Sequence, residues 1–347
     1  MLPREVGARD LRARGIDVPE RARQERHGPG GGASSGSRRT LLVLGWHNVV
    51  SSAFFPKRDR LSVRAFDVQV AALSRVMNVL PLDQALGRLT RGEPLPQRAV
   101  ALTFDDGYAD HLDVVAPILV RHRVPATFFL CPGLLDRTVQ PWWEVVGWAV
   151  NTARTGSVRW RDRRYGLASR QERRGVAGRI AEDLKRLDHE GRVQAVAALV
   201  EECRPSGRFD LDGLFLDWVG AQKLVELGFT IGSHTVSHCV MDRESAVRQA
   251  EEVNRCREAL AGRLGIDPML FAYPNGQADD FSQVTMDILE ASGHEFSVST
   301  IFGCNEQGTP PHAIRRVMVE PQHGPAAFIP MMRAQGRRTT RVPAAGH

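Results

Sequence analysis

The sequence of 347 residues lacks the long apolar segment that a membrane helix needs, since no apolar run approaches the roughly 18 residues required to cross a bilayer. It has only five cysteines, with neither a CxxC pair nor a framework spacing, so a disulfide scaffold is excluded and buried thiols are expected. At 25% charged and 42% hydrophobic residues, its composition also excludes collagen, coiled coil and wholesale disorder.

Charge is unevenly distributed along the chain. Residues 1–40 hold nine Arg against five acidic residues, and residues 333–347 hold four Arg and no acid, so the net charge of +6 leaves 41–332 at about −2. We therefore expect a disordered basic leader (1–40), a folded domain (41–332) and a basic C-terminal tail (333–347). Both basic segments are interpreted as solvated extensions, and no nucleic-acid partner is expected.

No secretory signal is visible, because no apolar segment follows the basic residues of the leader. A cytoplasmic location is therefore expected. A misassigned start codon would hide a signal and would place the protein outside the cytoplasm.

Short apolar runs alternate with helical patterns throughout the central region. This alternation predicts an α/β fold with a parallel sheet that is buried on both faces. One long segment, 136–219, interrupts it with a helical pattern and is interpreted as a helical insertion. The expected strands are 41–46, 99–104, 125–130, 229–232, 269–274, 295–300 and 313–319.

Polar side chains follow four of these strands at the point where each ends. They are His47, the pair Asp105 and Asp106, the segment SHTVSH (233–238), and the YPNG segment that begins at Tyr273. In parallel α/β barrels the carboxyl ends of the strands build the active site. We therefore expect these groups to meet at one edge of the sheet.

The pair Asp105–Asp106 is costly at a buried strand end unless another group neutralises it, and a divalent metal does so directly. His234 and His238 are four residues apart, so a helical turn would place both imidazoles on one side. Two His and one carboxylate leave positions open for water and substrate, as in catalytic zinc sites. The same ligand set binds Fe(II) in oxygenases, but the order of the motifs and the second, free Asp argue against that chemistry.

At these residues the chain resembles the polysaccharide deacetylase (NodB-homology, carbohydrate esterase family 4-like) family. The segments LTFDDGY, SHTVSH and FAYPNG look like its first three motifs, and LGWHNVV is similar to the YHxV-type opening of permuted members. The resemblance covers about 41–130 and 220–320. It implies a deformed (β/α)7-type barrel and a metal-dependent removal of acetyl groups from an acetylated polysaccharide or oligosaccharide.

By motif match, the resemblance implies that Asp106, His234 and His238 hold the metal, with Zn²⁺ expected. The unligated Asp105 is then the general base for a metal-activated water. A backbone N–H near Tyr273 is expected to stabilise the oxyanion of the intermediate.

Two departures from the family pattern move further roles to other residues. The late His motif that supplies the general acid is missing, so His47 is the candidate acid, with His312 and His323 as alternatives. The third motif has no Arg to hold the base, and Arg316 is expected to replace it, since strand alternation turns Arg315 to the opposite face.

Other functions stay open at this point. Related sequences hydrolyse small non-sugar C–N bonds, so an amidohydrolase is one alternative, and a glycan-binding barrel without catalysis is another. Trp142 and Trp143 suit either a wall for a sugar ring or an anchor for the insertion. The sugar, the acyl group, the role of the insertion and the oligomeric state are left open by the sequence.

Overall fold

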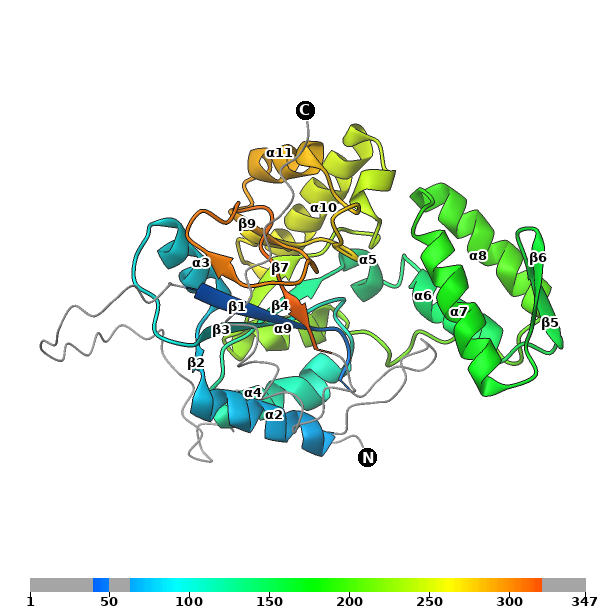
Figure 1. The fold of residues 1–347 in the computed structure, drawn as a ribbon, viewed down its shortest axis with the longest axis horizontal. Coiled ribbons are helices and arrows are strands. Elements are labelled where there is room, and N and C mark those ends of the chain that lie inside the picture. Colours follow the sequence, from blue (N-terminus) through cyan, green and yellow to red (C-terminus); the bar gives the residue numbers. More distant parts are fainter. Residues whose placement is uncertain (1–39, 50–62, 320–347) are drawn as a thin grey trace, which may run out of the picture.

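The computed structural model describes residues 40–49 and 63–319, and its main element is a curled parallel sheet (Figure 1). The parallel strands follow the order β1-β3-β4-β7-β8-β9, and β11 pairs in parallel with β1. Ile314, just before β11, bridges to Val298 of β9, so the last segment joins the two edges of the sheet. The strands of this sheet are β1 (Thr40–Trp46), β2 (Asn78–Val79), β3 (Ala99–Phe104), β4 (Thr127–Leu130), β7 (Thr230–Ser233), β8 (Leu270–Ala272), β9 (Phe296–Val298), β10 (Asn305–Glu306) and β11 (Val317–Met318).

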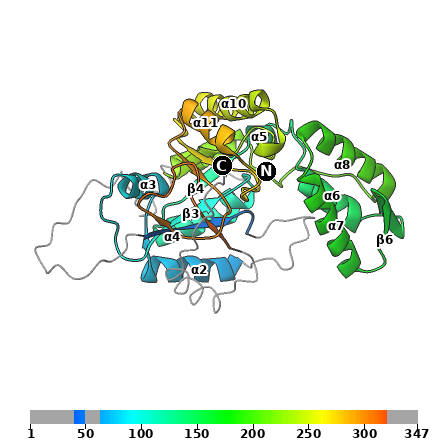
Figure 2. The ribbon, with the colours of Figure 1, turned by 45° about the horizontal axis from the view of Figure 1, so that its top comes forward.

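Strand β1 shows how the sequence builds two layers of core. Leu41 and Val43 point into the barrel, where they pack with α3 (Leu82–Thr90). Leu42 and Leu44 point outward and pack under the surrounding helices. In Figure 2, α2 and α4 lie on one side of the barrel and α10 and α11 on the opposite side. The helices outside the barrel are α2 (Val63–Val76), α4 (Ala116–His122), α9 (Trp218–Glu226), α10 (Ala246–Leu264) and α11 (Gln283–Ala291). The shorter elements are a π-helical turn (His111–Val115) that leads into α4, the helix α5 (Pro132–Leu135) and a 3-10 turn (Met241–Arg243).

The predicted deformed (β/α)7-type barrel is therefore confirmed. The expected strand 313–319 is shorter than predicted, since only Val317–Met318 forms regular pairs, beyond the single bridge at Ile314. The expected disordered leader and C-terminal tail lie outside the described residues, apart from Thr40, which begins β1.

The segment 136–219 forms a lobe beside the barrel, drawn in green in Figure 1. It contains the predicted helices and its own apolar core, but it also contains a β-hairpin that was not predicted. Val158 and Trp160 are buried and alternate with exposed Arg159, which is the pattern of a half-buried strand. The elements of the lobe are α6 (Trp142–Asn151), β5 (Ser157–Trp160), β6 (Arg163–Gly166), α7 (Arg170–Leu184) and α8 (His189–Cys203).

The five cysteines are all buried, as the sequence predicts, and none of them forms a disulfide. Within the ranges 40–49 and 63–319, none of the helices is both long and apolar enough to span a membrane.

Gly232 of β7 tests the packing inside the barrel. A Cβ atom there would lie 2.5 Å from Cε1 of Phe129 and 2.8 Å from the carbonyl oxygen of Leu270. We expect Gly232→Ala to lower the free energy of unfolding by about 1–3 kcal/mol, measured by chemical denaturation, because an overpacked core must shift its backbone. The control is Gly175→Ala on α7, where nothing lies within 4 Å and alanine should stabilise the helix. A Gly232→Ala variant as stable as the parent would contradict this packing.

Candidate metal centre

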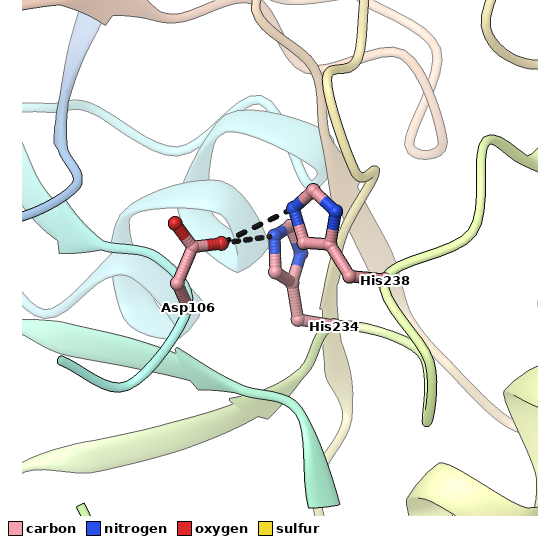
Figure 3. Close-up of side chains that lie close together, drawn as sticks. All are labelled: Asp106, His234 and His238. Carbon is pink, nitrogen blue, oxygen red and sulfur yellow. Dashed lines mark ion pairs between the residues drawn. The ribbon is translucent and has the colours of Figure 1, made fainter. Parts of the chain in front are cut away.

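Three buried side chains converge at the carboxyl edge of the sheet, as Figure 3 shows. Asp106 follows β3, while His234 and His238 follow β7. Asp106 Oδ1 lies 3.3 Å from Nε2 of His234 and 3.2 Å from Nε2 of His238. One ligand atom from each residue falls within 4.8 Å of the other two, which is close enough for all three to share one ion.

The two histidines lie on a loop rather than on the helical turn that their spacing suggested. Thr235 and His238 both have positive φ, at 61° and 53°, which no right-handed helix allows. The expectation of a helical turn was therefore wrong, although the two imidazoles still reach the same side. Such left-handed residues cost about 1–2 kcal/mol each, so the loop needs contacts that hold it.

Glu252 on α10 provides those contacts. Its carboxylate accepts hydrogen bonds from the backbone N–H of Val236 (2.8 Å) and Ser237 (2.9 Å) and from the Ser237 hydroxyl (2.8 Å). Arg248, one helical turn away, balances the buried charge at 2.7 Å. Sequence reasoning missed Glu252, but a signal was present, since it is a charged residue on the core-facing side of an amphipathic helix.

Asp105 is held by Arg316 in a two-point ion pair. The guanidinium donates to both carboxylate oxygens, at 2.8 and 2.7 Å, and both side chains are buried. Burial alone would raise the pKa of Asp105. The charge and hydrogen bonds of Arg316, together with the nearby histidines, outweigh burial and keep the pKa below its usual value. Arg315 is half-buried, and its side chain lies beside Gly303 instead of Asp105, as strand alternation predicts. Asp105 is thus an ionised carboxylate beside the three convergent ligands.

The three histidines considered as general acid differ in their distance from this centre. His47 is half-buried and follows directly after β1, so it lies at the same carboxyl edge of the sheet as Asp105 and Asp106, which follow the neighbouring β3. His312 instead bonds through Nδ1 to Ser297 (2.9 Å), within β9 and away from its carboxyl end. His323 lies outside the described residues.

Tyr273 itself does not supply the oxyanion donor that is expected near it. Its own backbone N–H donates to the carbonyl of Val298 at 3.1 Å as part of the sheet, so the expected N–H from the YPNG segment stays a prediction for its neighbours. Its hydroxyl donates to the carbonyl of His312 at 2.8 Å, and its ring stacks on Phe281. Tyr273 is therefore a packing residue here, because both of its donors are already used.

The donor set fits a divalent cation. Among the described residues, Asp106 Oδ1 is buried without a hydrogen-bond partner, although two imidazole nitrogens face it. His234 donates from Nδ1 to the carbonyl of Ala272 (2.7 Å), which leaves the lone pair of Nε2 directed at the centre. Burial lowers the pKa of His238, favouring the neutral imidazole that binds metals. Two nitrogens and one oxygen suit Zn²⁺ and leave positions open.

A further buried histidine, His294, lies behind the loop that carries His234 and His238. His294 is 3% exposed and bonds through Nε2 to the hydroxyl of Ser233 (3.1 Å) and through Nδ1 to that of Ser292 (2.7 Å). Burial lowers its pKa to about 3. It therefore stays uncharged in the folded protein across the whole physiological pH range.

Comparisons with known proteins agree with this geometry. A profile of the polysaccharide deacetylase family matches residues 92–297. Over 90 residues, the chain is 36% identical to the poly-beta-1,6-N-acetyl-D-glucosamine N-deacetylase of Escherichia coli (strain K12), which is 25% of this chain and 13% of that protein. The chain therefore matches only a small part of the length of that curated relative.

Two solved structures share the fold. Streptococcus pyogenes deacetylase PplD, solved in complex with acetate, aligns with a TM-score of 0.57 and 16% identity over 85% of this chain and 99% of that one. IcaB from Ammonifex degensii aligns with a TM-score of 0.53 and 19% identity over 85% and 97%. At these identities the likeness concerns the fold.

Arg316→Met should leave the Asp105 carboxylate buried without its partner. Removing one member of a buried ion pair costs about 3–5 kcal/mol, so we expect a loss of that order in the free energy of unfolding, measured by chemical denaturation. The matched control is Arg315→Met, at the neighbouring half-buried position, where the loss should be much smaller. If both variants lose the same free energy of unfolding, the ion pair between Arg316 and Asp105 does not stabilise the fold.

His294 should make the protein acid-sensitive. The unfolded chain protonates this imidazole near pH 6.5, whereas the folded protein does not until about pH 3. Stability attributable to His294 is therefore lost as pH falls between these values, by about 1.4 kcal/mol per unit. We expect His294→Gln to show a shallower decline in the free energy of unfolding between pH 6.5 and 5. Parallel pH profiles for parent and variant would refute this.

Proposed function

The chain belongs to the polysaccharide deacetylase family, and on this premise we propose that it removes acetyl groups from an N-acetylated glycan by metal-dependent hydrolysis. The observation that carries the proposal is the division of labour between two adjacent carboxylates. Asp106 faces two imidazole nitrogens, while Asp105 faces Arg316 and remains free of them. This arrangement offers one ligand and one base side by side.

Asp106, His234 and His238 would hold the cation. When bound there, a divalent cation such as Zn²⁺ supplies Lewis acidity toward the acetyl carbonyl and toward water. The three side chains are buried and approach from two strands, so they fix the position of the ligand atoms before substrate arrives.

Asp105 acts as the general base in this proposal. The Arg316 pair keeps the carboxylate ionised and fixes its orientation, because both oxygens are held by one rigid guanidinium. Each oxygen retains a lone pair that can accept the proton of the attacking water. Arg316 is in turn held by the Ser299 carbonyl (2.8 Å) and the Thr103 hydroxyl (3.1 Å), so the base sits on a rigid support.

His47 is the proposed general acid. It follows directly after β1, the strand next to β3, and it is half-buried, so in this proposal it faces both the centre and a substrate entering from solvent. In this role the imidazolium donates its proton to the departing amine nitrogen.

The proposed substrate is a polymer of N-acetylated hexosamine. The Escherichia coli relative is a poly-beta-1,6-N-acetyl-D-glucosamine N-deacetylase, and the matched family is named for polysaccharide deacetylation. An amide bond is therefore the first one to test, ahead of an acetyl ester on a neutral glycan.

Asp105→Asn tests the roles of the two carboxylates. We expect this variant to bind Zn²⁺ with the stoichiometry of the parent but to release acetate from poly-beta-1,6-N-acetyl-D-glucosamine about 10²–10⁴-fold more slowly, the usual effect of losing a general base. Removing the metal with a chelator should abolish acetate release by the parent, and added Zn²⁺ should restore it. Acetate is measured enzymatically, and metal content by elemental analysis.

The matched control is Asp279→Asn, which changes an exposed carboxylate and should leave the rate unchanged. If Asp105→Asn also loses its zinc, the division between ligand and base is wrong. Acetate release from acetylated xylan but not from the amide polymer would move the proposal to ester hydrolysis. No release from any glycan would refute the deacetylase function.

A further inference from the structure

The two histidines of the centre are oriented by different means. His234 is fixed by its hydrogen bond to the Ala272 carbonyl, the usual arrangement for a metal-ligating imidazole. His238 has no such bond, because its buried Nδ1 finds no partner among the described residues. Instead its ring lies against the indole of Trp143, with ring centroids 4.3 Å apart and an angle of 46° between the planes.

Trp143 is itself held by a directed chain of buried hydrogen bonds. Its Nε1 donates to the Tyr108 hydroxyl at 2.7 Å, and that hydroxyl donates to Oε1 of Glu144 at 2.9 Å. The indole therefore has one orientation, because turning it would break a chain that is shielded from water.

The insertion also forms backbone hydrogen bonds with the loop that carries Asp106. Backbone bonds join Ala109 N–H to the Leu214 carbonyl (3.0 Å) and Leu216 N–H to the Gly107 carbonyl (2.8 Å). Between them the ring of Tyr108 stacks on Phe215 at 4.6 Å. The start of α6 and the exit segment 214–216 thus hold the Asp106 loop from two sides, and neither end of the lobe is a free linker.

We propose that Trp143 is a positioning residue for His238, and that the lobe 136–219 thereby completes the metal centre instead of being an appended module. The inference rests on the proposed function in so far as it takes Asp106, His234 and His238 as metal ligands. Of the two roles open from the sequence for Trp143, this is closer to the anchor, because the side chain is only 7% exposed. In this proposal Trp143 does more than attach the lobe to the barrel, because it also orients the imidazole of His238.

The expected consequence is weaker metal binding when the indole is removed. Without Trp143, the imidazole of His238 can turn about its side-chain bonds, and this freedom must be lost again on each binding event. Partners that orient a ligand typically change metal affinity by about 10–100-fold when mutated. We expect a change of this size for Zn²⁺ in Trp143→Leu.

The experiment compares Trp143→Leu, Trp143→Phe and Tyr108→Phe in the full chain. Zn²⁺ dissociation constants are measured by competition with a chromophoric chelator, and the visible absorption of the Co²⁺-substituted proteins reports ligand geometry. Trp143→Phe keeps a smaller aromatic face and should lose only part of the affinity that Trp143→Leu loses. Tyr108→Phe should show a similar, measurable partial loss, because it frees the indole. Thermal unfolding of the metal-free proteins is recorded alongside.

The matched control is Trp148→Phe, on the same helix and equally buried, whose ring contacts Phe209 instead of His238. It should lower the unfolding temperature without altering Zn²⁺ affinity or the Co²⁺ spectrum. If Trp143→Leu behaves like Trp148→Phe, the inference is overturned while the metal site stands. If Trp143→Leu does not fold, the other two variants decide. Unchanged Zn²⁺ affinity and an unchanged Co²⁺ spectrum in both Trp143→Phe and Tyr108→Phe would overturn the inference. A parent protein that binds no Zn²⁺ overturns the proposed function and this inference together.

Discussion

Two carboxylates on consecutive residues cannot both remain charged inside a protein unless each has its own partner, and the architecture of this site follows from that constraint. Asp105 receives a guanidinium from the last strand, while Asp106 receives two imidazoles from the loop after β7. Because the two partners are of different kinds, the two carboxylates have different chemistry. One is held by a guanidinium as an ionised carboxylate, and the other faces two imidazole nitrogens.

Barrel closure makes that separation possible. Arg316 and Asp105 are 211 residues apart in sequence, and they meet because β11 pairs with β1, which in turn pairs with β3. The inward positions of neighbouring strands then fall next to one another, so Thr103, Asp105 and Arg316 form one bonded group. The ion pair and the closure of the sheet therefore support each other.

The loop of the two histidines depends on groups from outside the barrel edge. Glu252 holds its backbone from α10, and Trp143 covers one imidazole from the insertion. Left-handed residues at Thr235 and His238 make this loop intrinsically unfavourable, so such external contacts are what keep the ligands in place. The lobe 136–219 is thus tied to the chemistry of the centre as well as to the shape of the molecule.

Local pattern was sufficient for much of this protein. Apolar runs followed by polar residues located β1, β3 and β7 and the groups at their ends, and strand alternation separated Arg316 from Arg315, because these features depend on neighbours in the chain. Alternation around Val158 also marked the unpredicted hairpin, but the Arg-rich composition masked it.

Only the tertiary structure decided the rest. The hydrogen bonds of the Tyr273 N–H, the loop conformation at His238, and the roles of Glu252 and Trp143 all depend on contacts between segments far apart in sequence. Sequence periodicity records which face of an element is buried, but it does not record which polar group meets which partner there. That pairing is set by the closed sheet and the docked lobe, and it determines which donors remain free for chemistry.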